Sequence, residues 1–196
     1  MLSLAAAAGA LAGILGILSF VPYIRSILAG KTKPNRTTWW IWSLVGLIIV
    51  ASYLFSNEPT GYTIILPISY FSGQLVVAIL SLWYGVGGWT PFDRFCLVGV
   101  GISLLLWWLF GSPLAALLTN IVIDFFGALP TIRKSYLLPE TENLTSWLIT
   151  FGSDVFNVFA IQAATFFVLA YPLYLLFTNG IITALLLIPH VRRRAR

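Results

Sequence analysis

Seven long apolar stretches occupy almost the whole chain. A membrane-spanning helix needs about 20 mostly apolar residues, and inside hydrocarbon a helix satisfies all of its own backbone polar groups. Only 9% of the residues are charged, whereas soluble domains carry about 25%. The sequence therefore predicts an all-α polytopic membrane protein. Its seven transmembrane helices are expected at residues 3–29, 37–56, 62–85, 94–110, 113–137, 145–167 and 171–190.

Part of the first half of the chain recurs in the second half at a constant offset of 108 residues. Pro22-Tyr-Ile-Arg returns as Pro130-Thr-Ile-Arg, and Asn35-Arg-Thr-Thr-Trp returns as Asn143-Leu-Thr-Ser-Trp. Repeats of this kind are typical of transporters built from two similar halves around a central site. We expect three units in a parallel 3+1+3 plan. They are a triple-helix repeat at 1–92, a linker helix at 93–110 and a second repeat with a basic tail at 111–196.

All eleven cationic residues fall on one side of the membrane when the seven expected spans are laid out in order. Because cytoplasmic loops are enriched in Lys and Arg, we expect an outside N-terminus and a cytoplasmic C-terminus. The protein would be a multi-pass integral membrane protein, in the inner membrane if it is prokaryotic. We interpret the basic tail as an orientation signal that also touches lipid headgroups, and we expect no nucleic-acid partner. The cationic residues are Arg25, Lys31, Lys33, Arg36, Arg94, Arg133, Lys134, Arg192, Arg193, Arg194 and Arg196.

Two prolines occupy equivalent places in the repeat. Pro22 and Pro130 lie about two helical turns before the cytoplasmic ends of the first and fifth expected helices. A proline inside a helix removes a backbone hydrogen bond and kinks the chain. We therefore predict that the pair acts as hinges when the cytoplasmic side opens and closes.

The second helix of each half begins with a repeated polar pattern. Asn35 and Asn143 are predicted to cap these helices, because a side-chain oxygen can accept a hydrogen bond from a free backbone amide. Trp39 and Trp147 follow four residues later and are predicted to lie in the aromatic belt at the membrane interface.

These features resemble the PQ-loop pattern, in which a proline late in one helix is followed by a short basic loop and a polar start to the next helix. The pattern occurs twice around a linker helix, as in seven-helix PQ-loop and SWEET-like transporters, including cystinosin-type exporters. Residues 19–22, Ser-Phe-Val-Pro, also resemble the first helix of the half-size SemiSWEETs. The motif glutamine is replaced by Tyr23 and Thr131, and the SemiSWEET sugar-site positions hold Ala51 and Pro67. The resemblance thus implies the fold and solute transport, and it does not identify the solute as a sugar.

Two carboxyl groups are expected near the bilayer centre. Asp124 and Asp154 each lie roughly 15 Å into their helices, where a charged Asp costs about 2.5–3.5 kcal/mol. No Lys or Arg is expected at that depth, so both are candidates for substrate binding or proton coupling. The resemblance adds that cystine exporters carry a functional aspartate in the sixth helix, about two residues before the position of Asp154. The alternative is that both acids are protonated and only bridge helices.

Further polar residues share the faces of these acids or lie in the facing half. Asn120 precedes Asp124 by one turn, and Asn157 continues a stripe that includes Asp154. The predicted site for substrate binding or proton coupling comprises Asp124, Asp154, Asn157, Asn120, Gln74, Tyr53 and Tyr70.

The chain carries no motif for catalysis, for a metal or for a cofactor, so we expect none of these. The predicted function is transport of a small polar solute by alternating access, with proton coupling and homo-oligomerisation left open. One alternative is a proton-regulated sorting receptor that resembles the KDEL receptor. Another is a vitamin carrier of the nicotinamide riboside type, whose opposite orientation disagrees with the charge pattern.

Overall fold

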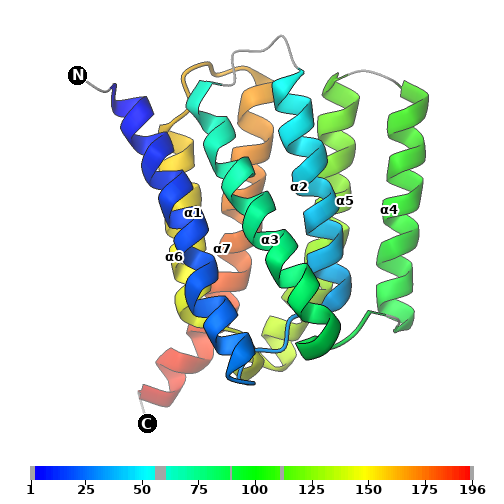
Figure 1. Ribbon diagram of the computed structural model, residues 1–196, viewed down its shortest axis with the longest axis vertical. Helices are drawn as coiled ribbons and strands as arrows, with labels where there is room; N and C mark the ends of the chain where they lie inside the picture. The colour runs from blue at the N-terminus through cyan, green and yellow to red at the C-terminus, as the bar shows by residue number, and fades with distance from the viewer. Residues whose placement is uncertain (1–2, 56–60, 89, 111–112, 195–196) are drawn as a thin grey trace.

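The computed structural model describes residues 3–55, 61–88, 90–110 and 113–194, which form an all-helical bundle (Figure 1). Within these ranges there is no β-strand, and a single isolated bridge joins Asn35 to Val86. Glu58, between the second and third expected spans, and Arg196, the last residue of the basic tail, lie outside the described residues. The α-helices are α1 (Leu4–Leu28), α2 (Arg36–Leu54), α3 (Ile65–Tyr84), α4 (Pro91–Phe110), α5 (Pro113–Leu137), α6 (Leu144–Phe159) and α7 (Phe166–Arg194), with 3-10 turns η1 (Gly61–Ile64) and η2 (Pro139–Thr141).

The expected bounds of the sixth and seventh helices were wrong. Helix α6 ends at Phe159 rather than at residue 167, and α7 begins at Phe166 rather than at residue 171. The amide of Ala160 donates to the carbonyl of Phe156, which closes the last turn of α6. The hydroxyl of Thr165 accepts a hydrogen bond from the amide of Val168 at 3.3 Å, which caps α7. Apolar content could not place this break, because the sequence is apolar on both sides of it.

The surface of the bundle is rich in apolar side chains. Large exposed residues include Leu47, Ile79, Val98, Trp108 and Phe177, and contiguous apolar surface of this kind is rare on soluble monomers. Three helical segments in the described part of the chain are long and apolar enough to cross a membrane, namely Leu4–Leu28, Gly61–Tyr84 and Phe166–Ile188. The protein therefore has the properties of a membrane protein, while the full set of seven spans stays a prediction.

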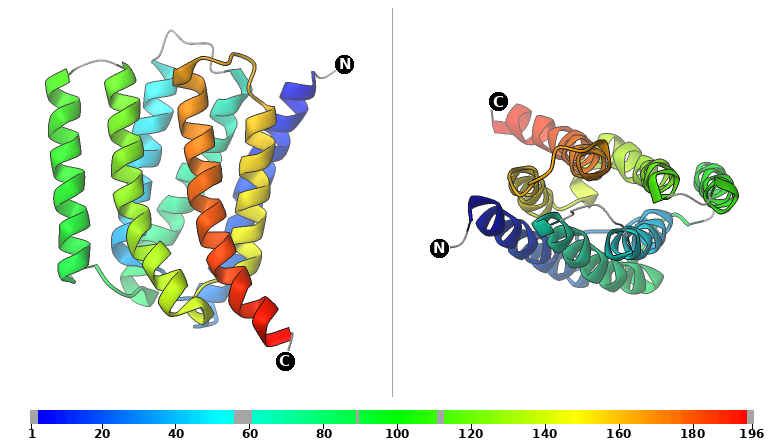
Figure 2. Two further views of the ribbon diagram at one scale, coloured as in Figure 1. Left: turned by 180° about the vertical axis from the view of Figure 1, so that it is seen from behind. Right: turned by 90° about the horizontal axis from the view of Figure 1, so that it is seen from above.

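The six helices other than α4 form two groups with the same internal arrangement (Figures 1 and 2). In the first half, α3 packs against both α1 and α2, and in the second half, α7 packs against both α5 and α6. The halves meet where α1 packs against α6 and where α2 packs against α5. Helix α4 lies at one side of the bundle, mainly against α5.

Small residues let α1 approach its neighbours closely. A Cβ atom added to Gly13 would lie 2.4 Å from Ile65, and one added to Gly16 would lie 2.8 Å from Leu66. On the other side of α1, the hydroxyl of Ser153 donates to the carbonyl of Ala12 at 2.6 Å. Small side chains at helix contacts are the usual means of close packing in membrane bundles.

The predicted caps of α2 and α6 are confirmed. Asn35 accepts a hydrogen bond from the amide of Thr38 at 3.0 Å, and Asn143 accepts one from Ser146 at 2.9 Å. Both caps lie at the same end of the bundle, at the bottom of Figure 1. We call it the basic end, because it carries Arg25, Lys31, Lys33, Arg94, Arg133 and Lys134.

The two prolines of the repeat lie inside helices, as predicted. Pro22 is within α1 and Pro130 is within α5. Each is followed by about two turns of helix before the basic end, so both stand where a bend would move the helix ends. Their action as hinges stays a prediction.

Candidate functional site

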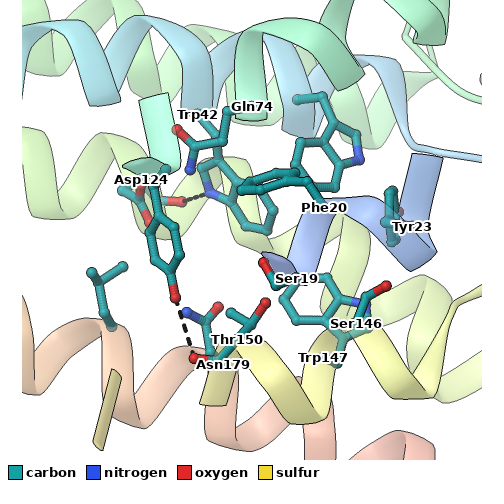
Figure 3. Close-up of a pocket in the computed structure, with 13 residues that line it drawn as sticks. Ser19, Phe20, Tyr23, Trp42, Gln74, Asp124, Ser146, Trp147, Thr150 and Asn179 are labelled. Atoms are coloured by element: carbon teal, nitrogen blue, oxygen red, sulfur yellow. Dashed lines mark hydrogen bonds between the residues drawn. The ribbon is translucent and has the colours of Figure 1, made fainter. Parts of the chain in front are cut away.

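A cavity lies in the middle of the bundle and is lined by all six helices of the two halves but not by α4 (Figure 3). Its volume is about 40 Å³. One water molecule needs about 10–15 Å³ measured in this way, so the cavity as it stands holds only a few waters. The lining residues are Ser19, Phe20, Tyr23, Trp39, Trp42, Tyr70, Gln74, Asp124, Ser146, Trp147, Thr150, Leu175 and Asn179.

Five of the lining rings form a continuous series of edge-to-face contacts, which we call the aromatic wall. Tyr70 contacts Phe20 with ring centroids 6.3 Å apart, and Phe20 contacts Trp39 at 6.1 Å. Trp42 contacts Trp39 at 5.2 Å and Trp147 at 6.1 Å. The prediction that Trp39 and Trp147 lie in an interfacial belt was therefore wrong, because both are buried and line the cavity.

Hydrogen bonds fix the orientation of two rings of the aromatic wall. The indole N–H of Trp42 donates to the backbone carbonyl of Asp124 at 3.2 Å, which links α2 to α5. The indole N–H of Trp147 donates to Oε2 of Glu142 at 3.0 Å. A buried Trp N–H usually finds a partner, and these two contacts hold the ring faces of Trp42 and Trp147 in place beside the cavity.

Asp154 is fully buried behind the cavity lining and bonds to two residues that belong to that lining. The hydroxyl of Tyr70 lies 2.7 Å from its Oδ1, and the amide of Asn179 donates to its Oδ2 at 2.8 Å. The Tyr70 oxygen also lies 3.2 Å from the carbonyl of Thr150. Tyr70 has only one hydroxyl hydrogen. Both of its contacts are complete when the Asp154 carboxyl carries a proton and donates it to Tyr70, while Tyr70 donates to Thr150.

Asp124 reaches the cavity from α5. Its Oδ2 accepts a hydrogen bond from the hydroxyl of Tyr174 at 2.6 Å, and the residue is 4% exposed. None of the described residues that line the cavity is Lys or Arg. Asp124 and Asp154 are thus bonded to neutral groups in the described structure, and neither takes part in an ion pair there.

A third buried acid, Glu142, has a very different environment at the basic end. Its side chain is 0% exposed and forms an ion pair with Lys134 at 2.6 Å. The hydroxyl of Tyr23 donates to its Oε1 at 3.3 Å, and Lys134 also donates to the backbone carbonyl of Lys33. We call Tyr23, Lys33, Lys134, Glu142 and Trp147 the Glu142 network. It joins the two halves, because Tyr23 and Lys33 belong to the first and the other three to the second.

The residues that follow the repeated prolines both contribute bonds between the halves. Tyr23 donates to Glu142, and the hydroxyl of Thr131 donates to that of Thr38 at 3.0 Å. A backbone bond from Lys33 to the carbonyl of Thr141, at 3.2 Å, adds to these contacts. The halves are therefore held together near the basic end, on the side of the cavity where Tyr23 lies.

A fourth buried acid, Asp93, lies in the first turn of α4, away from the cavity. Its Oδ2 accepts bonds from the amide of Gly88 at 2.9 Å and from the amide and hydroxyl of Thr90 at 3.0 and 2.7 Å. Burial alone raises the pKa of Asp93, but these hydrogen bonds favour the carboxylate and leave its pKa below the usual value. Asp93 therefore fixes the start of α4 as an anion.

The seven predicted site residues divide into three groups. Asp124, Tyr70 and Gln74 line the cavity, and Asp154 is one hydrogen bond away from it. The remaining three are buried but lie outside the lining, and they are Asn120, Asn157 and Tyr53. Tyr53 packs instead against Phe167, with ring centroids 6.0 Å apart.

Sequence reasoning included Tyr70 but missed the other four rings of the aromatic wall, and it missed Glu142 and Asn179 as parts of the site. The polar pair Asn179 and Thr183, one turn apart in a mostly apolar stretch of α7, was a usable signal. Thr183 donates to the carbonyl of Trp147 at 3.1 Å. The burial of Glu142 had no comparable signal, because a short loop with acidic residues is usually exposed.

The described residues contain no group of three or more His, Cys, Asp or Glu side chains that could hold a metal ion. Comparison of the chain with protein-family models, curated proteins and solved structures gave no match.

Proposed function

We propose that this protein is a membrane transporter that moves a small polar solute by alternating access between two triple-helix halves, as in PQ-loop and SWEET-like carriers. The observation that carries the proposal is the central cavity, to which helices of both halves contribute. A site between two halves is exposed to one side or the other when the halves rock against each other.

The helix contacts support a two-fold relation between the halves. Helices α1, α2 and α3 of the first half correspond to α5, α6 and α7 of the second. A two-fold relation between the halves therefore turns the contact of α1 with α6 into a contact of α5 with α2, and both contacts are present. The contacts inside one half are likewise matched in the other. This agrees with the constant sequence offset and with parallel repeats joined by α4.

The small volume of the cavity requires an opening movement. A space of about 40 Å³ holds only a few waters, so a solute is admitted only after the halves separate. At the basic end this breaks the bonds of Tyr23 to Glu142, of Lys134 to Lys33 and of Thr131 to Thr38. Since the positive-inside rule makes this end cytoplasmic, the conformation is the one closed to the cytoplasm.

The position of the hinges supports the same movement. Pro22 and Pro130 immediately precede Tyr23 and Thr131, each of which bonds to the opposite half. A bend at either proline therefore moves a residue that holds the halves together.

The polar contacts of Asp154 support coupling to protons. With a proton on the carboxyl, Asp154 donates to Tyr70 and Tyr70 donates to Thr150, whereas without it Tyr70 has two acceptors for one hydrogen. Gain or loss of this proton therefore changes a contact that joins α3 of the first half to α6 of the second.

A disulfide between the halves tests the proposal. Thr38→Cys and Thr131→Cys, in a Cys96→Ser background, replace side chains whose oxygens are 3.0 Å apart across the interface. The matched control is Ser26→Cys with Thr32→Cys, whose oxygens are 2.7 Å apart within the first half.

Proteoliposomes loaded with a mixture of sugars, amino acids, amines and vitamins report release of each solute by mass spectrometry. We expect release of at least one solute by the reduced protein, none after oxidation of the Thr38/Thr131 pair, and no effect of oxidation on the control pair. No release of any solute, or release that oxidation leaves unchanged, contradicts alternating access between these halves.

A further inference from the structure

We propose that the central cavity binds a small organic cation with an ammonium group, held by the aromatic wall and by Asp124, with Asp154 behind it. This inference rests on the proposed transport function and names the substrate class of the same site. It is drawn from the charges, the ring faces and the use of hydrogen-bond donors in the cavity.

The charges of the cavity favour a cation. Asp124 lines the cavity and Asp154 bonds to two lining residues, Tyr70 and Asn179. No described lining residue is cationic, and Lys134 is held by Glu142 at the basic end. A buried carboxylate without a cation is costly, so an ammonium ligand supplies the missing charge. An anionic solute would meet two carboxyl groups and no cation.

The aromatic wall supplies the second element of cation recognition. Trp39, Trp42 and Trp147 come from both halves and lie beside Phe20 and Tyr70 around the same space. An ammonium group over the face of a Trp or Tyr ring is attracted by the negative charge density of that face, most strongly when the pair is desolvated. Rings that meet edge to face present their faces in different directions, which allows them to surround a compact cation.

Most of the hydrogen-bond donors around the cavity are already used by the protein, with the indole N–H of Trp39 as an exception that has no partner among the described residues. The N–H groups of Trp42 and Trp147 and the side-chain amide of Asn179 donate to protein acceptors. The hydroxyls of Tyr70 and Tyr23 also lie against protein oxygens. The hydroxyl groups of a sugar need both donors and acceptors from the protein, and the cavity offers few free donors.

Apart from the N–H of Trp39, the buried side-chain atom of the lining that has no partner is an acceptor. Gln74 lines the cavity, is 8% exposed, and its side-chain oxygen has no hydrogen-bond partner among the described residues. An acceptor oxygen, a carboxyl group and ring faces together match the N–H or N-methyl groups of an ammonium ion. The same set leaves most hydroxyls of a polyol without partners.

A pair of probes of the same shape tests the charge requirement. Choline carries a positively charged trimethylammonium group where 3,3-dimethyl-1-butanol carries a neutral tert-butyl group of the same shape. Glucose serves as the polyol probe. Binding to the purified wild-type protein is measured by isothermal titration and by thermal unfolding. We expect saturable binding of choline and of the related probes tetramethylammonium and phenethylammonium, and none of the neutral alcohol or of glucose.

A variant locates the cation. Asp124→Asn keeps the shape of the side chain and should weaken choline binding at least about tenfold, because it removes the charge that pairs with the ammonium group in a desolvated site. The matched control Glu140→Gln makes the same chemical change at an exposed residue and should leave the affinity unchanged.

The proposal is overturned by equal binding of choline and the alcohol, by binding of glucose alone, by no binding of any ammonium probe, or by full affinity in a folded Asp124→Asn. The wild-type comparison decides the charge class even if the variant does not fold. The outcome is also separable from the transport proposal. Release of a neutral solute that the Thr38/Thr131 disulfide blocks would leave transport intact and refute only the cation.

Discussion

Glu142 and Asp154 are both fully buried carboxyl groups that bond to a tyrosine of the first half, yet their surroundings differ in one respect. Glu142 bonds to Tyr23 and forms an ion pair with Lys134. Asp154 bonds to Tyr70 and to a neutral amide, and no described cation pairs with it. The first carboxyl closes one end of the bundle, and the second lies beside the central cavity.

A buried carboxyl group bonded to a tyrosine therefore behaves differently according to whether a cation also pairs with it. A buried ion pair resists separation, because removing one member leaves an unpaired buried charge at a cost of about 3–5 kcal/mol. A buried carboxyl group bonded only to neutral groups can be neutralised either by a proton or by a bound cation. We therefore propose that the Glu142 network closes the basic end and that Asp154 and Asp124 exchange charge with a proton or a bound cation.

The largest expected effect comes from removing the paired carboxyl. Glu142→Gln leaves Lys134 buried without its counter-charge and should destabilise the closed conformation by about 3–5 kcal/mol. The measurement is labelling of a cysteine at Ser19, in the cavity lining, by an impermeant thiol reagent from the basic end. We expect faster labelling in the Glu142→Gln background. The exposed Glu140→Gln is the control, and equal rates in both backgrounds would refute the role of the network.

A smaller effect is expected from the unpaired carboxyl. Asp154→Asn has the same shape but cannot gain or lose the proton that joins it to Tyr70. It should cost about 1–3 kcal/mol in stability, abolish the dependence of transport on a pH gradient and leave some exchange. Uptake into proteoliposomes with and without the gradient measures this, and a gradient response retained by Asp154→Asn would exclude it as the coupling residue. Asp124→Asn should change the pH dependence less.

The hinge prolines should affect rate more than stability. Replacing Pro22 and Pro130 by Ala restores regular helix near the bonds of Tyr23 and Thr131 to the other half. We expect expression close to wild type and transport slowed severalfold in the double variant, measured as initial uptake rates. Wild-type rates would mean that the prolines are tolerated rather than used.

The smallest effect concerns Asp93, whose pKa is lowered by hydrogen bonds from Thr90 and Gly88 despite burial. The stability that this carboxylate contributes is present above the usual Asp pKa of about 3.9 and is lost as the pH falls through the lower folded value. Asp93→Asn should therefore flatten the decline of thermal stability below about pH 4, by no more than about 1 kcal/mol. A decline identical to that of the wild type would contradict this.

The sequence predicted those features that follow from local pattern. The bounds of α5 and the caps Asn35 and Asn143 agree with the structure, because apolar length and a capping side chain are local properties. The candidates Asp124 and Gln74 do line the cavity, since a polar residue in an apolar helix tends to face the interior.

The features that the sequence did not predict depend on contacts between the halves. Tryptophans near the start of a helix are typical of an interfacial belt. Trp39 and Trp147 line the cavity instead because α2 and α6 both pack around it. Glu142 follows Lys134 by eight residues, with η2 between them. This spacing does not predict a buried ion pair between the two side chains. Tyr53, Asn120 and Asn157, predicted as site residues, are buried but lie outside the cavity lining.

The central claim is that the cavity between the halves opens alternately to the two sides of the membrane. It is tested most directly with Ser19→Cys in a Cys96→Ser background, labelled by an impermeant thiol reagent in right-side-out and in inside-out vesicles. We predict that the cysteine at position 19 is labelled from both sides of the membrane. We also predict that the Glu142→Gln background raises the rate from the basic end and lowers it from the other. Labelling from only one side in both backgrounds, or from neither, would contradict the central claim.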